Sequence, residues 1–71
     1  MANVELLKEH IADSGMTMTA IAEKAGILRE TLYNRLKGKG EFTAPEIVAL
    51  QRVLHLTNKD RDDIFLRSKG N

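Results

Sequence analysis

Helix start and stop signals recur along the whole of this chain, and no other feature limits its fold as strongly. The clearest signal is Thr43-Ala44-Pro45-Glu46, a capping box in which the threonine and the glutamate each bond the other's backbone amide. The only proline lies in this first helical turn, where it interrupts no helical hydrogen bond. No segment alternates apolar and polar residues as a half-buried strand does. The sequence therefore predicts an all-α fold.

Five helical segments follow from these signals. The residues that can cap their first turns are Asn3, Thr17, Thr43 and Thr57. The glycines that can end the first three are Gly15, Gly26, Gly38 and Gly40. The last segment begins with Thr57-Asn58-Lys59-Asp60, again a capping box in form. We expect one compact five-helix bundle over residues 1–71, with a frayed tail at 68–71.

The size of the chain allows one modest hydrophobic core. The chain has 71 residues, of which 42% are hydrophobic, and domains of this size bury a single core. Only two Phe and one Tyr are present, so this core must be aliphatic. Helical spacing assigns to it Leu7, Ile11, Ile21, Ala22, Leu32, Leu36, Ile47, Leu50, Val53 or Leu54, Leu56, Ile64 and Phe65.

Several functional classes are excluded by what the sequence lacks. There is no cysteine, which excludes a disulfide framework and a thiolate zinc site. His10 and His55 lie on different predicted helices with no carboxylate at metal-ligand spacing, so we predict no metal and no cofactor. No glycine-rich loop follows a strand and no nucleophile has a neighbouring base, so we predict no catalysis. No apolar run approaches the roughly 18 residues of a membrane span and no signal-peptide pattern is present, so we expect a cytoplasmic protein.

Positive charge is concentrated in one central stretch. Residues 1–23 carry one lysine against four acidic residues, a net charge of −3. Residues 24–39 carry five basic residues against Glu30 alone, a net charge of +4. A stretch of this kind is either the footprint of a polyanion or an ordinary solvated surface.

Residues 17–37 form two short predicted helices joined by a tight turn at Gly26, the helix-turn-helix arrangement. Ala22 is small, as a close crossing of the two helices requires, and Ile21 and Ile27 fill the space between them. The outward face of the second helix carries Arg29, Glu30, Tyr33, Asn34 and Lys37. By spacing alone, this face belongs either to a DNA-reading helix or to an ordinary corner between two helices with a polar surface.

The positions around this corner follow a family pattern, namely Gly15-Met16-Thr17, Ile21-Ala22, Gly26-Ile27, Arg29-Glu30-Thr31-Leu32 and Lys37-Gly38-Lys39. With these residues the chain resembles the Cro/C1-type helix-turn-helix family, the lambda-repressor-like domain of five helices, over roughly residues 4–66. The resemblance implies a sequence-specific regulator of transcription that binds double-stranded DNA, of phage or prophage Cro or repressor type. Its second motif helix would enter the major groove of an operator.

The resemblance also implies roles for individual side chains. Base reading falls to Leu28, Arg29, Glu30, Tyr33 and Asn34. Phosphate contacts fall to Thr17, Thr19, Thr31, Lys37 and Lys39. Arg29 is the strongest candidate, because a guanidinium can bond guanine O6 and N7 together, and its alternative role is an ion pair with Glu30. Lys24 and Arg35 are expected to be solvated charges.

Three departures from the family pattern concern structural positions. Leu28 stands where relatives have a capping Ser or Thr, so it either leaves backbone amides free or contacts a thymine methyl group. Met18 stands where many relatives have a phosphate-binding Gln, and we expect it to pack instead. Ile11 and Leu36 replace a buried Arg–Glu pair, which removes both charges together.

The implied partners are an operator and a second copy of the chain. Relatives bind palindromic sites as symmetric dimers, so we expect a homodimer, at least on DNA. Its surface is expected around Phe65, Leu66 or Leu56, although Phe65 can also close the core. The competing hypothesis is a protein-interaction module of the same fold, an antirepressor or antitoxin that binds another phage regulator or a toxin. The regulator would act in the cytoplasm of a bacterial host, at the nucleoid.

Overall fold

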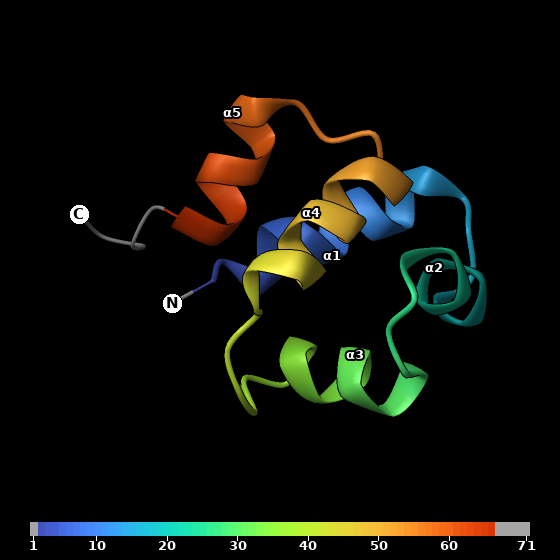
Figure 1. Cartoon of the computed structure of the whole chain (residues 1–71). Coiled ribbons are helices and arrows are strands. Elements are labelled where there is room, and N and C mark those ends of the chain that lie inside the picture. Colours follow the sequence, from blue (N-terminus) through green and yellow to red (C-terminus); the bar gives the residue numbers. More distant parts are fainter. Residues whose placement is uncertain (1, 67–71) are drawn as a thin grey trace.

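The computed structural model describes residues 2–66, which form five α-helices and no strand. The helices are α1 (Val4–Ser14), α2 (Met18–Ala25), α3 (Arg29–Leu36), α4 (Ala44–Val53) and α5 (Asn58–Arg61) (Figure 1). A π-helical segment, Asp62–Leu66, continues α5. The predicted all-α fold of five helices is confirmed. The predicted frayed tail at 68–71 lies outside the described residues.

Local capping explains where the helices begin. The side chains of Asn3 and Thr17 accept hydrogen bonds from backbone amides three residues further on, at 3.2 and 3.1 Å. Thr43 and Thr57 each form a complete capping box. All four predicted N-caps are therefore confirmed. Helix α3 differs, because its N-cap residue, Leu28, makes no hydrogen bond through its side chain.

The turn between α2 and α3 is fixed by two backbone hydrogen bonds. The amide of Ile27 donates to the carbonyl of Ala22 at 3.0 Å, and the amide of Gly26 donates to that of Glu23 at 3.2 Å. This is a Schellman motif, and it requires a left-handed residue at Gly26, where φ is 70°. Leu28 then returns to an extended conformation before α3 begins. The first residues of α3 consequently have a defined position relative to α2.

Helices α1 to α4 and the π-helical segment all contribute to one core. Five side chains are fully buried, one each from α1, α2, α3, α4 and the π-helical segment: Leu7, Ile21, Leu32, Leu50 and Ile64. The remaining buried side chains are Ala22, Leu36, Val53, Leu54, Leu56 and Phe65. Ile11 and Ile47, also predicted to be core residues, are only partly buried against this cluster. The predicted aliphatic core is confirmed, with one aromatic contact between the rings of Phe42 and Phe65, whose centroids are 5.1 Å apart.

The burial of Leu56 and Phe65 corrects the predicted dimer surface. Their exposed fractions are 6% and 9%, because both close the core beneath α5. Of the three residues named for that surface, only Leu66 is exposed, at 63%. Leu56 and Phe65 therefore belong to the core, where helical spacing also placed them, and the alternative in which Phe65 closes the core is the one confirmed.

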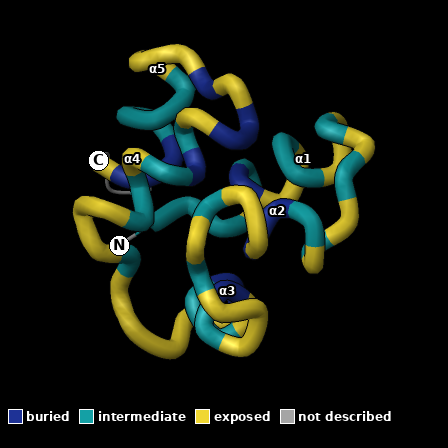
Figure 2. The backbone as a smooth tube through the Cα atoms, turned by 45° about the vertical axis from the view of Figure 1, so that its right-hand side comes forward, coloured by how far each residue is buried: buried dark blue, intermediate teal, exposed yellow. Residues whose placement is uncertain are grey.

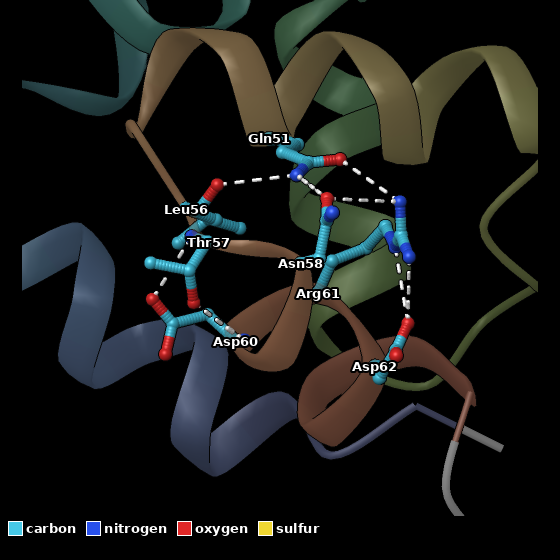
Figure 3. A network of polar contacts seen from close by, with 7 residues as sticks. All are labelled: Gln51, Leu56, Thr57, Asn58, Asp60, Arg61 and Asp62. Atoms are coloured by element: carbon cyan, nitrogen blue, oxygen red, sulfur yellow. Dashed lines mark hydrogen bonds and ion pairs between the residues drawn. The ribbon is translucent and has the colours of Figure 1, made fainter.

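A network of hydrogen bonds joins α5 to α4 (Figure 3). Gln51 donates through Nε2 to the Leu56 carbonyl at 3.2 Å and to Asn58 Oδ1 at 3.0 Å. Arg61 Nη2 lies 2.9 Å from Asp62 Oδ1, and its Nη1 reaches both Gln51 and Asn58. His55 lies in this connection with a φ of 54°, so its predicted place on a helix was wrong. The connection between α4 and α5 is thus held by side chains on both sides.

Helices α3 and α5 lie at opposite ends of the molecule, with α4 between them in both views (Figures 1 and 2). Along α3, buried Leu32 and Leu36 alternate with exposed and half-buried residues (Figure 2). This arrangement leaves the outward side of α3 uncovered, and the five predicted base-reading residues lie there.

Candidate nucleic-acid interface

The outward side of α3 forms one shallow concavity. Its lining consists of the N-cap residue and the outward side chains of the helix: Leu28, Arg29, Glu30, Tyr33, Asn34 and Lys37. Spacings of three and four residues bring these positions to one face, while Leu32 and Leu36 turn into the core. All five residues predicted to read bases therefore share a single surface, together with one predicted phosphate ligand.

The beginning of α3 presents an apolar side chain and free backbone donors. Leu28 is 77% exposed, the highest value among the large hydrophobic residues of the described chain. It supplies no cap, so no group in the described residues accepts from the amides of Arg29, Glu30 and Thr31. Unpaired amides at a helix N-terminus carry partial positive charge and attract anions. The predicted loss of the cap is thus confirmed.

Arg29 is held by α2 and not by its neighbour on α3. Its Nη1 donates to Thr19 Oγ1 at 3.2 Å. Among the described residues it forms no ion pair with Glu30 or with any other carboxylate. The alternative role as a partner of Glu30 is therefore not supported by the geometry, and most of the guanidinium remains available to a ligand.

Three other predicted phosphate residues do not line the concavity. Thr17 is exposed and uses its hydroxyl oxygen to cap α2, which leaves the hydroxyl hydrogen free to donate. Thr31 is half-buried on the flank of α3. Lys39 is exposed in the turn after α3, where its amide donates to the Asn34 carbonyl at 2.8 Å. The structure therefore groups Lys37 with the base-reading set and places Thr17, Thr31 and Lys39 outside the lining of the concavity.

Arg35 is the main correction to the predicted site. It was expected to be a solvated charge, but its guanidinium forms two hydrogen bonds with Glu46 of α4, at 3.1 Å from Nε and 3.4 Å from Nη2. The exposed fractions of the two side chains are only 21% and 16%. Gly40 leaves room for this arginine, because a Cβ there would lie 2.5 Å from Arg35 Nη1. Arg35 therefore joins α3 to α4 and is not part of the outward surface.

The surroundings of Glu46 keep it ionised. Burial by itself would raise the pKa of its carboxyl group, but the Thr43 amide and the Arg35 guanidinium outweigh burial and hold the pKa below its ordinary value of 4.5. The Thr43 amide donates to Oε1 at 2.9 Å. Sequence reasoning found Glu46 as a capping residue and missed its ion pair, since the pair joins two helices whose packing no spacing rule specifies.

Without Arg35, the basic surface has fewer cations, and those that remain are not paired with carboxylates of the described residues. The exposed cations of residues 24–39 are Lys24, Arg29, Lys37 and Lys39, and none of them forms an ion pair within the described part of the chain. Against Glu30 they give a net charge of +3, four positive charges less one negative. Met18 packs against the core, as expected.

Other kinds of site find no support in residues 2–66. No group of three or more His, Cys, Asp or Glu side chains gathers there in a way that could hold a metal ion. None of the helices in this range has the length and apolar character needed to cross a bilayer. His10 is half-buried and His55 exposed. No protein-family model, curated protein or solved structure matches the chain.

Proposed function

We propose that this chain is a sequence-specific regulator of transcription, of phage or prophage Cro or repressor type, that binds double-stranded DNA in the bacterial cytoplasm. In this proposal α2 and α3 are a helix-turn-helix, and α3 enters the major groove of an operator. The observation that carries the proposal is the single concavity lined by Leu28, Arg29, Glu30, Tyr33, Asn34 and Lys37. These side chains offer donors, acceptors and an apolar group on one uncovered face, as base reading requires.

Each side chain of this face suits a particular base edge. The free donors of Arg29 fit guanine O6 and N7, and the amide of Asn34 fits adenine N6 and N7. Glu30 can accept from cytosine N4, and exposed Leu28 can contact a thymine methyl group. Tyr33, 42% exposed, can extend its hydroxyl to a base or a phosphate. Because Glu30 would repel phosphates if it served no purpose, its presence here favours sequence reading over non-specific binding.

Phosphate contacts would fix the orientation of α3 and make binding depend on salt. Their donors are the hydroxyls of Thr17, Thr19 and Thr31, the ammonium groups of Lys37 and Lys39, and the free amides that open α2 and α3. Each phosphate neutralised by a cation releases counterions, so affinity falls steeply as the salt concentration rises.

A homodimer formed on a palindromic operator completes the proposal, because a single recognition helix reads only a short half-site. The burial of Leu56 and Phe65 leaves Leu66 as the exposed apolar residue near that end of the chain. Of the residues predicted for the dimer surface, one exposed leucine is less apolar surface than a stable dimer needs, which favours a dimer that forms on DNA.

Fluorescence anisotropy of labelled duplexes tests the proposal. Wild type, Arg29→Ala and Lys8→Ala would be titrated with a pool of duplexes at about 50 and about 200 mM salt. Lys8 is an exposed α1 cation outside the concavity, so its removal controls for the loss of one charge. We expect salt-sensitive, sequence-selective binding by wild type and Lys8→Ala, and loss of selectivity in Arg29→Ala.

The opposite result would favour the competing function. If wild type bound duplex DNA only at a weak non-specific level, direct DNA recognition would be abandoned. A protein-interaction role, as an antirepressor or antitoxin, would then be the better explanation of the uncovered α3 face. In that case removal of the α3 surface charges, as in Arg29→Ala, would leave binding to the protein partner intact.

A further inference from the structure

We infer that Thr19 sets the specificity of Arg29 by holding its guanidinium while itself bonded to a DNA phosphate. This inference rests on the proposed function and deepens it. Thr19 would then be more than one of several phosphate contacts. It would transmit the position of the DNA backbone to the side chain that reads a base.

The geometry places the two residues at the junction of α2 and α3. Thr19 is the second residue of α2, and Arg29 is the first residue of α3. The bond of 3.2 Å from Arg29 Nη1 to Thr19 Oγ1 is the only polar contact of the guanidinium within the described residues. The Schellman turn at Gly26 fixes the two helix ends that carry them. Arg29 is therefore restrained at a single point and otherwise free.

Thr19 has enough hydrogen-bonding groups to bind the Arg29 guanidinium and a phosphate at the same time. Its Oγ1 accepts from Arg29, so its hydroxyl hydrogen must be directed to a different acceptor. Its backbone amide lies in the first turn of α2, where Thr17 Oγ1 bonds only the amide of Ala20. Thr19 thus presents two free donors, a hydroxyl and an amide, to an acceptor-only group. A phosphate oxygen is such a group.

The restraint on Arg29 has a consequence for base selection. A free arginine side chain loses much rotamer entropy when it binds a ligand. A hydrogen bond to a neighbouring group restricts the rotamers before binding, so that less entropy is lost on binding. The bond to Thr19 uses one of five guanidinium donors, and two of the remaining four can make a bidentate contact with guanine. With Thr19 fixed on a phosphate, Arg29 can reach only a narrow range of positions in the groove. A wrong base there would leave its donors unpaired.

The test measures two quantities for each variant: the affinity for the preferred duplex, and the discrimination against a duplex with one altered base pair. A randomised duplex pool gives the sequence that wild type prefers, and the base pair whose preference disappears in Arg29→Ala identifies the position read by Arg29. Dissociation constants are then measured for the preferred duplex and for the duplex altered at that base pair. The variants are Thr19→Val, which keeps the shape and removes the hydroxyl, Thr19→Ser, which restores it, and Lys39→Ala, which removes an unrestrained phosphate ligand.

We expect Thr19→Val to lower the ratio of the two dissociation constants by about three- to ten-fold. Thr19→Ser should restore the ratio, and Lys39→Ala should weaken binding to both duplexes equally. In the Arg29→Ala background, Thr19→Val should no longer change the ratio. Thr19 is exposed, so the variant should fold, and circular dichroism with Thr19→Ala as a second variant checks this.

Two results would overturn the inference and leave the proposed function intact. One is an equal loss of affinity for both duplexes in Thr19→Val, as for Lys39→Ala, which would make Thr19 a phosphate ligand only. The other is an unchanged ratio and affinity. If wild type selected no sequence from the pool, both the inference and the proposed function would fail.

Discussion

Two arginines at opposite ends of the molecule, Arg29 and Arg61, have contrasting surroundings. Arg61, at the end of α5, bonds Asp62, Gln51 and Asn58, all within the chain (Figure 3). Arg29, at the start of α3, bonds only the hydroxyl of Thr19. Both arginines belong to short helices that follow a tight turn. The difference is that the chain supplies several partners for the donors of one arginine and a single partner for those of the other within the described residues.

The contrast extends from these residues to their regions. Around α4 and α5 the capping boxes are complete and the connecting turn is bonded by side chains. Around α3 no side chain caps the N-terminus of the helix, the Leu28 side chain is exposed, and Lys37 and Lys39 have no ionic partner among the described residues. Polar groups left unpaired on a rigid support are typical of a binding surface, because a bound ligand can then satisfy them. The predictions below test that distinction.

The largest effect is expected where the two regions join, at the Arg35–Glu46 pair. Glu46→Ala should lower the free energy of unfolding by about 2–3 kcal/mol, because it leaves a largely buried guanidinium unpaired and breaks a capping box. Chemical denaturation would measure it. Glu5→Ala, which breaks the exposed Glu5–Lys8 pair, is the control and should cost about 0.5 kcal/mol or less. Equal losses in the two variants would show that the Arg35–Glu46 pair contributes no more than a surface pair.

Arg29→Ala and Arg61→Ala should have opposite consequences. Arg29→Ala should remove about 2 kcal/mol of discrimination between operator bases and leave thermal stability nearly unchanged. Arg61→Ala should lower the free energy of unfolding by about 1 kcal/mol, since it removes bonds to Gln51, Asn58 and Asp62, and should preserve discrimination. Anisotropy and thermal melts of both variants would measure this. A loss of discrimination in Arg61→Ala would contradict the division between a structural and a reading region.

Acid should destabilise the region around α4 and α5 through two carboxylates whose pKa values are lowered, Glu46 and Asp60. The pKa of Glu46 is held below 4.5 in the folded protein, so its contribution to stability is complete above that pH. It is lost as the pH falls through the lowered value. Asp60 acts in the same direction below its ordinary 3.8, because the Thr57 amide and hydroxyl lower its pKa. Denaturation midpoints across this acid range should fall less steeply for Glu46→Gln than for wild type. An identical slope would show that Glu46 titrates normally.

Most of the fold could be predicted because it is encoded locally. The N-caps at Asn3, Thr17, Thr43 and Thr57 bond amides three residues away, so the sequence alone contains both partners. Helical spacing likewise identified which α3 residues share a face. The same local rules could not show that Arg35 would meet Glu46, eleven residues further along, since that contact depends on how α3 packs on α4.

Two further features were inaccessible for the same reason. Helical spacing assigned Phe65 to the core, but no sequence signal indicated the π-helical segment that carries it or the contact of its ring with Phe42. The bond from Arg29 to Thr19 depends on the angle between α2 and α3. Sequence patterns thus identified the members of the candidate surface, and the tertiary structure determined which of them are restrained.

The smallest predicted effect concerns Leu28, whose side chain cannot cap α3. Leu28→Ser would supply the oxygen that the first amides of α3 lack, and should raise the free energy of unfolding by about 0.5–1 kcal/mol relative to Leu28→Ala. Both substitutions remove the exposed isobutyl group, so both should lose any preference for thymine at the contacted position. Denaturation and binding-site selection with the two variants separate these effects. If Ser and Ala were equally stable, the α3 amides would already be satisfied by water. If thymine preference survived both substitutions, Leu28 would have no part in reading, and its exposure would be an uncompensated cost to the start of α3.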